Sequence, residues 1–126
     1  MNNRPHIFVL VSDLFFISRV ESAVRQAGCS VESLDSYRTV SEFLELLRAH
    51  PPALIVLDLN SALPWAEWLP AAKSDSLTSS IPWLAFGSHM NPKRLAAARR
   101  AGADRVVPKS QFTAELNEII GQMRKS

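Results

Sequence analysis

The sequence predicts a single α/β domain in which a parallel sheet carries helices on both faces. Three observations lead to this fold class. The chain of 126 residues has the length of one ordinary domain. Its hydrophobic fraction of 47% is enough for a core, and its charged fraction of 21% is ordinary for a globular protein. Short apolar runs alternate with longer amphipathic stretches, which is the pattern of buried strands joined by helices.

Five short apolar runs are the predicted strands. His6–Val11 and Ala53–Leu57 are almost continuously apolar, as expected of strands that are buried on both faces of a sheet. Ser30–Leu34 is shorter and more polar, which suits the edge of a sheet. Trp83–Phe86 and Arg105–Val107 complete the set.

Five amphipathic stretches are the predicted helices, because apolar side chains recur in them at spacings of three and four residues. Gly28 and Gly102 stop the first and the fourth, and Pro51-Pro52 blocks continuation of the second. The five are Leu14–Gly28, Tyr37–His50, Pro64–Lys73, Pro92–Ala101 and Gln111–Arg124. The alternation of strands and helices predicts the parallel, doubly covered sheet.

Composition and charge narrow the possible functions. The single cysteine, Cys29, excludes an internal disulfide and is expected to be a partly buried thiol. No secretory signal opens the chain, and no apolar run approaches the ~20 residues of a membrane span. We therefore expect a cytoplasmic protein without membrane contact. The formal net charge of +2 does not by itself indicate nucleic-acid binding.

Basic residues nevertheless gather near the end of the chain. Residues 91–110 contain six Lys or Arg side chains and one acid, Asp104. The stretch is either a solvated helix face that also meets partners or a surface that attracts a phosphate backbone. No nucleic-acid motif accompanies it, so the first interpretation is favoured. Salt-sensitive DNA binding would favour the second.

Polar residues follow several predicted strands at the point where each strand ends. They are Ser12-Asp13, Asp58, Gly87-Ser88 and Pro108-Lys109. Ligands of open parallel sheets bind outside the carboxyl ends of the strands, so these residues should converge. Asp58, after the buried run Ala53–Leu57, is the predicted functional centre.

The chemistry of these residues suits magnesium and a phosphoryl group. Asp13, Asp58 and the backbone carbonyl of Asn60 offer the hard oxygen ligands that Mg²⁺ takes, alongside water and phosphate oxygens. A carboxylate such as Asp58 can also carry a phosphoryl group as an aspartyl phosphate. Lys109 would neutralise phosphoryl oxygens there. Each residue alone is weak evidence, because a single Asp after a strand is commonly a turn or cap residue.

Four segments of the chain resemble the receiver domain of bacterial two-component response regulators, of the chemotaxis-regulator type. The resemblance extends from about His6 to Arg124. The segments are Val9–Asp13, Pro52–Asn60, Ile81–Ser88 and Ala101–Lys109. It implies a flavodoxin-like fold with five parallel strands in the order 2-1-3-4-5.

The resemblance also implies roles for the residues at the strand ends. Asp58 corresponds to the phosphoacceptor, and Lys109 to the lysine that contacts the phosphate. Asp13 corresponds to the acid that meets the metal directly, and Asn60 would add its backbone carbonyl. Mg²⁺ is then the implied cofactor. A sensor histidine kinase or another signalling protein is the implied partner.

The chain departs from the family pattern at three positions that matter. Ser12 replaces the first acid of a pair, which should weaken metal binding. Gly87 stands where the family has a Thr or Ser, and Ser88 follows one residue later, where its side chain points elsewhere. Val106 replaces the usual switching Tyr or Phe. The phosphoacceptor is retained, but the hydroxyl and the aromatic ring that normally respond to its phosphorylation are both replaced.

Three functions remain open from the sequence. The favoured one is a stand-alone receiver-like domain, residues 1–126, that signals through protein–protein contacts and is not an enzyme. Phosphorylation at Asp58 controls it, or it is a phosphorylation-independent pseudo-receiver. The last helix ends the chain, so we expect output through a partner, with Pro92–Met123 as a possible dimer face implied by the resemblance. The others are an unrelated small-molecule or enzymatic α/β domain and nucleic-acid binding.

Two aromatic pairs have more than one interpretation. Phe15 or Phe16 could cover the acidic pocket, although core packing is favoured for Phe16. Trp65 and Trp68 share one helix face and form either an exposed interaction patch or a buried contact with the sheet.

Overall fold

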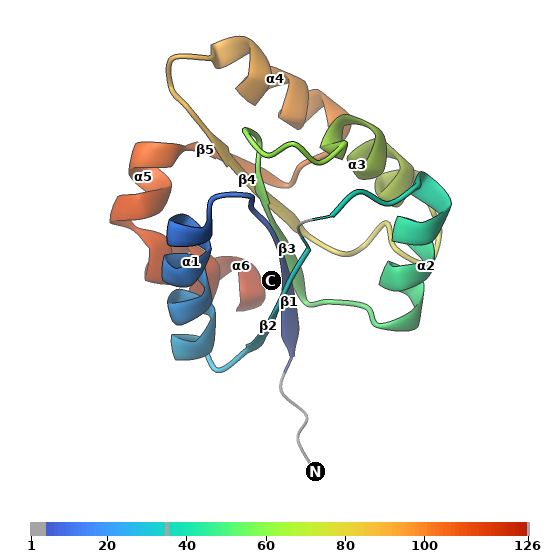
Figure 1. The fold of residues 1–126 in the computed structure, drawn as a ribbon, viewed down its shortest axis with the longest axis horizontal. Coiled ribbons are helices and arrows are strands. Elements are labelled where there is room, and N and C mark those ends of the chain that lie inside the picture. Colours follow the sequence, from blue (N-terminus) through green and yellow to red (C-terminus); the bar gives the residue numbers. More distant parts are fainter. Residues whose placement is uncertain (1–4, 35, 126) are drawn as a thin grey trace.

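A computed structural model describes residues 5–34 and 36–125 as a three-layer α/β fold (Figure 1). The strands are β1 (His6–Leu10), β2 (Ser30–Ser33), β3 (Leu54–Asp58), β4 (Trp83–Gly87) and β5 (Arg105–Pro108). The helices are α1 (Leu14–Gln26), α2 (Val40–Ala49), α3 (Trp65–Ser74), α4 (Pro92–Ala101), α5 (Lys109–Ala114) and α6 (Leu116–Lys125). None of the described helices is both long enough and apolar enough to traverse a bilayer.

All neighbouring strands pair in parallel, in the order β2-β1-β3-β4-β5. The predicted fold class and strand order are therefore confirmed. In this register Asp58, the last residue of β3, pairs with Phe86 of β4. β2 lies on one side of β1, whereas β3, β4 and β5 follow on the other side. The boundary between β1 and β3 is therefore the switch point where such sheets bind ligands.

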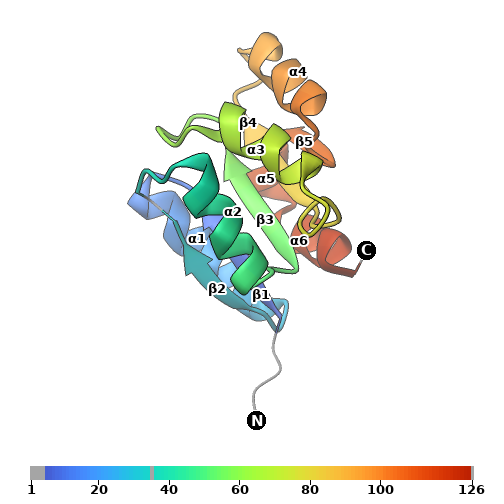
Figure 2. The ribbon, with the colours of Figure 1, turned by 90° about the vertical axis from the view of Figure 1, so that its right-hand side faces the viewer.

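Each face of the sheet has its own hydrophobic core. Side chains on a strand point alternately to opposite faces, so Val9 joins the core under α1, α5 and α6, while Phe8 joins the core under α2, α3 and α4. Figure 1 separates α1, α5 and α6 from α2 and α3, and Figure 2 looks onto the α2 and α3 face. Asp58 sits at the carboxyl edge, where these two packed layers meet water.

Aromatic stacking fills both cores and settles the open aromatic interpretations. Phe16 is buried within 5.1 Å of Phe86, so the prediction that it packs in the core is confirmed. Phe86 in turn stacks on Phe112 with ring centroids 4.2 Å apart. Phe15 is 80% exposed. On the opposite face Trp68 is fully buried against Phe43, at 4.3 Å.

The tryptophans of α3 therefore do not form an exposed patch. Trp68 donates its indole N–H to the carbonyl of Arg38 at 3.0 Å, which satisfies the buried polar atom. Trp65 is half-buried and donates to the carbonyl of Leu59 at 3.1 Å. The buried alternative is the correct one, and Trp65 also fastens α3 to the loop that follows Asp58. Cys29 is completely buried, rather than partly buried as predicted.

The final predicted helix, Gln111–Arg124, is wrong in its start and in its continuity. The helix begins at Lys109, directly after Pro108, and is interrupted at Glu115, whose φ of −118° and ψ of 26° leave the helical region. Phe112, Leu116 and Ile120 nevertheless all reach the core. Apolar spacing is the same on both sides of the interruption, so periodicity alone could not reveal it.

The second predicted helix began too early. It starts at Val40 rather than Tyr37, because Thr39 caps it. The Thr39 hydroxyl accepts from the Glu42 N–H at 3.1 Å, and the Glu42 carboxylate accepts from the Thr39 N–H at 2.9 Å. This reciprocal pair is a capping box, and Thr-x-x-Glu in the sequence was a sufficient signal for it.

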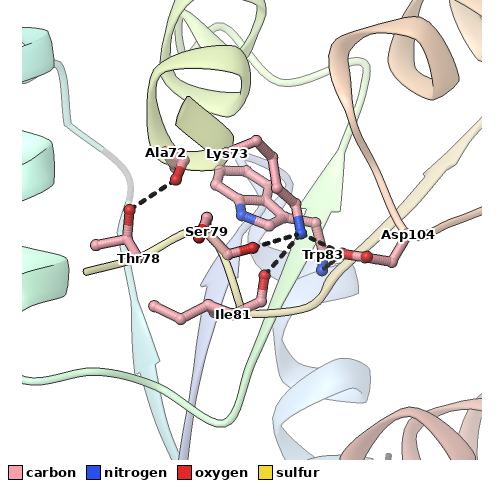
Figure 3. Close-up of polar contacts among 7 residues, drawn as sticks. All are labelled: Ala72, Lys73, Thr78, Ser79, Ile81, Trp83 and Asp104. Carbon is pink, nitrogen blue, oxygen red and sulfur yellow. Dashed lines mark hydrogen bonds and ion pairs between the residues drawn. The ribbon is translucent and has the colours of Figure 1, made fainter. Parts of the chain in front are cut away.

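A polar cluster ties α3 to the amino end of β4, at the sheet edge opposite to Asp58 (Figure 3). The Lys73 ammonium pairs with the Asp104 carboxylate at 2.7 Å and donates to the Ile81 carbonyl at 3.0 Å. The same Asp104 oxygen accepts from the Trp83 N–H at 2.7 Å. This cluster fixes the start of β4 and so contributes to positioning the far end of that strand.

Candidate functional site

Asp58 is a nearly buried acid at the carboxyl edge of the sheet. Its side chain is 7% exposed, and its Oδ1 accepts from the Asn60 N–H at 2.9 Å. No other hydrogen bond to this carboxylate comes from the described residues. Burial raises the pKa of Asp58 above its ordinary value, although the Asn60 N–H and the charge of Lys109 oppose the shift. The site therefore holds a poorly solvated carboxylate with one engaged oxygen.

Asp13 lies at the N-terminus of α1, in the turn that follows β1. Its Oδ1 accepts from the N–H groups of Phe15 at 3.0 Å and Phe16 at 3.3 Å, so it is the N-cap of that helix. The carboxylate is exposed, and its charge contributes to the raised pKa of Asp58. Asp13 thus has a structural role as a cap and also lies in electrostatic range of Asp58.

Lys109 is the first residue of α5, directly after β5 ends at Pro108. Its ammonium lies 4.9 Å from the centroid of the Phe16 ring, which positions the cation over a buried aromatic surface. Its charge lowers the pKa of Asp58. The two do not form an ion pair: among the side chains of residues 5–34 and 36–123 the pairs are Arg48–Asp75 and Lys73–Asp104.

Arg94 was not singled out for this site from the sequence. It lies in the first turn of α4, and its guanidinium donates to the Asn60 side-chain oxygen at 2.7 Å. Its charge, like that of Lys109, lowers the pKa of Asp58. In the sequence Arg94 was one of several basic residues in the same stretch. Only folding shows that it reaches a residue 34 positions earlier.

Gly87, where the receiver pattern has a hydroxyl, is tightly packed. A Cβ atom at Gly87 would lie 3.2 Å from Leu59 Cδ1, 3.3 Å from Leu59 Cβ and 3.4 Å from Leu95 Cδ2. The Ser88 hydroxyl, one residue later, accepts from the Met90 N–H at 3.1 Å within its own turn. Ser88 is thus engaged locally, and Leu59 fills the space beside Gly87.

Two further departures have structural roles. Ser12 is exposed, and its hydroxyl accepts from the Ala62 N–H at 3.4 Å, so it links the β1 turn to the loop after β3. Val106 is half-buried against the core under α4. Neither side chain supplies the charge or the aromatic ring that it replaces.

The donor set is compatible with a magnesium ion that keeps most of its waters. The described part of the chain contains no group of three or more His, Cys, Asp or Glu side chains placed to hold a metal. Asp13 and Asp58 each have one carboxylate oxygen without a hydrogen bond to another described residue, and the Asn60 carbonyl is equally unengaged. Mg²⁺ is commonly bound through one or two carboxylates, so these residues fit it.

No protein-family model matches the chain, and no curated protein matches its sequence. Its fold, however, is close to several solved structures. A Chloroflexus aurantiacus protein described as a response regulator shares 20% identity over 98% of this chain and 100% of its own, with a TM-score of 0.79. The receiver domain of a Pseudomonas aeruginosa sensor histidine kinase, described with magnesium in its active-site cleft, shares 14% identity over 98% and 99%, also at 0.79. The receiver domain of a Colwellia psychrerythraea DNA-binding response regulator shares 16% over 97% and 99%, at 0.77. The chain therefore has the receiver-domain fold of response regulators.

Proposed function

We propose that the chain is a receiver module of two-component signalling in which Asp58 accepts a phosphoryl group. The observation that supports this most is the placement of Asp58. It is a buried acid at the end of β3, and one of its oxygens accepts a hydrogen bond from Asn60. The charges of Asp13 and Lys109 act on it at the carboxyl edge of the sheet. Residues 1–126 would act as one signalling domain through protein–protein contacts, without an enzymatic output of their own.

The free oxygen of Asp58 would attack the phosphorus of the donor. A bond forms between that oxygen and phosphorus while the bond between phosphorus and the donor breaks, and the donor's leaving group keeps the electron pair. A histidine kinase carrying phosphohistidine is the donor that fits this fold. The deprotonated carboxylate of Asp58 is the form that attacks.

Asp13, Asp58 and the Asn60 carbonyl would hold Mg²⁺, and Lys109 would contact the phosphoryl oxygens. The metal supplies charge neutralisation at the transferring group. A magnesium-containing active-site cleft in the Pseudomonas aeruginosa receiver domain supports this assignment by analogy of fold. Because Ser12 takes the place of an acid, we expect weaker magnesium binding than two adjacent acids would give. The surface from Pro92 to Met123 is the face that we propose for a partner or a second copy.

A phosphorylation-independent interaction module is the second candidate. It is favoured by the packing at Gly87, where a Cβ atom would already press on Leu59, and by the absence of an aromatic ring at Val106. In that case the fold would present its surfaces to a partner in one state only.

Beryllofluoride with Mg²⁺ separates the two candidates, because it mimics a phosphoryl group on an aspartate. Addition of millimolar reagent to the full chain should shift the amide NMR signals around Asp58, and acetyl phosphate should add one phosphoryl mass. Asp58→Asn should abolish both effects. Thr78→Ser, a conservative change in the loop before β4 and therefore far from the carboxyl ends of the strands, serves as the control and should leave both unchanged. No response of the wild-type chain at this concentration would rule out the phosphorylated version.

A further inference from the structure

A second cation, Arg94, approaches the surroundings of Asp58 from a helix on the other face of the sheet from the helix that carries Lys109. Lys109 begins α5 after β5, whereas Arg94 comes from α4 after β4. The link is short. The Arg94 guanidinium donates to Asn60 Oδ1 at 2.7 Å, and the Asn60 N–H donates to Asp58 Oδ1 at 2.9 Å. One residue thus contacts both the arginine and the acid.

The neighbouring basic residues of α4 make no such contact. Lys93, Arg99 and Arg100 are exposed, and their side chains have no hydrogen bond or ion pair with any described residue. Arg94 is exposed as well, but its guanidinium is held by a hydrogen bond. The Asn91 side chain accepts from its backbone N–H at 3.1 Å and so caps the helix, while Asn60 holds its guanidinium. Immobilising a long side chain in this way lowers the entropy cost of binding a ligand there.

The formal charges of Asp58 and of the groups that act on it cancel one another. Ser12 contributes no charge, so Asp13 and Asp58 are opposed by Lys109 and Arg94, and the formal sum is zero. Converting the Asp58 carboxylate to an acyl phosphate adds negative charge and three acceptor oxygens. A guanidinium has five N–H donors in a planar fork that matches phosphate oxygens, and Asn60 occupies only one of its nitrogens.

We propose that Arg94 is a phosphoryl-binding residue of this site, which donates to the phosphoryl oxygens on Asp58. Its positive charge compensates for the weaker magnesium binding that follows from Ser12 in place of an acid. The inference rests on the proposed phosphorylation of Asp58. It assigns to α4 a direct contact with the phosphoryl group. The first turn of α4 would then sense the modification without a hydroxyl at position 87 or an aromatic ring at position 106.

Arg94→Gln tests the inference against Arg99→Gln, a matched control on the same helix. Trp65 donates to the carbonyl of Leu59, next to Asp58, so tryptophan fluorescence can follow binding. In Arg94→Gln the affinity for beryllofluoride with Mg²⁺ should fall roughly tenfold or more, as for a lost charged hydrogen bond. The affinity for Mg²⁺ alone should rise, by about threefold, because a nearby positive charge is removed. Arg99→Gln should change neither.

The opposite signs of these two effects distinguish phosphoryl binding from a structural role. A destabilised site would lose both ligands, and urea unfolding of both variants checks that the fold is intact. Arg94→Lys keeps the charge without the fork and should recover only part of the beryllofluoride affinity. If the wild type binds beryllofluoride and Arg94→Gln binds it equally well, the role of Arg94 is refuted while the proposed function stands. If the wild type itself does not bind, both fail.

Discussion

Substitution of Gly87 by threonine would put back the hydroxyl that the receiver pattern places here, and the structure predicts that this costs stability. The new Cβ would lie 3.2 and 3.3 Å from two carbons of Leu59 and 3.4 Å from Leu95. One of the Leu59 atoms is Cβ, which cannot move away without the backbone. Overpacking a closed core position costs about 1–3 kcal/mol.

A partial gain opposes that cost. Replacing glycine restricts the unfolded chain and stabilises a protein by about 0.4–1 kcal/mol when the native backbone accepts the new residue. Gly87 does not have a positive φ, so its backbone accepts a side chain. The net expectation for Gly87→Thr is a loss of about 1–2 kcal/mol in the free energy of unfolding. Gly87→Val should lose a similar amount, because Val has nearly the same shape without the hydroxyl.

A double-mutant cycle with Leu59→Ala measures whether Leu59 is the cause. Leu59→Ala alone should cost about 2–5 kcal/mol, because the side chain is 2% exposed. Leu59→Ala removes the contact with Cδ1 at 3.2 Å but keeps the Leu59 Cβ at 3.3 Å, so it relieves only part of the crowding. The double variant should therefore be more stable than the sum of the single effects, by up to about 1 kcal/mol. Urea unfolding followed by fluorescence of the buried Trp68 and Trp83 gives each free energy, provided that the slope with urea is unchanged.

The reasoning would be refuted if Gly87→Thr were as stable as the wild type. It would also be refuted if the effects of Gly87→Thr and Leu59→Ala on the free energy of unfolding were additive. Gly121→Ala is the glycine control, because Gly121 lies in α6 with no atom within 4 Å of a new Cβ. It should raise the free energy of unfolding by up to about 1 kcal/mol, the usual helical gain.

Two further predictions concern charge and backbone. Because burial raises the pKa of Asp58 in the folded state, its ionised form costs stability above that pKa, and the cost vanishes as the pH falls below the ordinary value of 3.8. Asp58→Asn should therefore stabilise the chain at pH 7, on the order of 1 kcal/mol, with no gain near pH 3; an equal gain at both pH values in urea unfolding would contradict this origin. Gly102 has a φ of +116°, and a Cβ there would lie 2.9 Å from Lys73 Cγ. Gly102→Ala should lower the unfolding free energy by more than about 1 kcal/mol in the same assay, and a stability at or above that of the wild type would contradict the strain.

The carboxyl-edge residues illustrate what a sequence can reveal. Asp13, Asp58 and Lys109 were identified because each follows an apolar run, and parallel strands bring their carboxyl ends to one edge. That inference needs only the order of the elements. The fold class and the strand order follow in the same way, from local periodicity and a resemblance spread over four segments.

Arg94 and Leu59 show where this reasoning stops. Nothing near Arg94 in the sequence distinguishes it from Arg99 or Arg100, because its partner Asn60 lies 34 residues away. Leu59 looks like one more apolar residue after a strand, and only packing shows that it closes the space at Gly87. The interruption of the last helix at Glu115 likewise leaves no signal in the sequence, since the apolar spacing continues through it.

The sequence by itself determined that this chain forms a doubly covered parallel sheet with an acid at the centre of its carboxyl edge. Repeated patterns along the chain encode such features, because a helix buries one face periodically and a strand covered on both faces is continuously apolar. The tertiary structure alone decided which side chains surround that acid and which space is closed. Those outcomes depend on contacts between residues distant in the chain, whose geometry is set by how the two cores pack on the sheet.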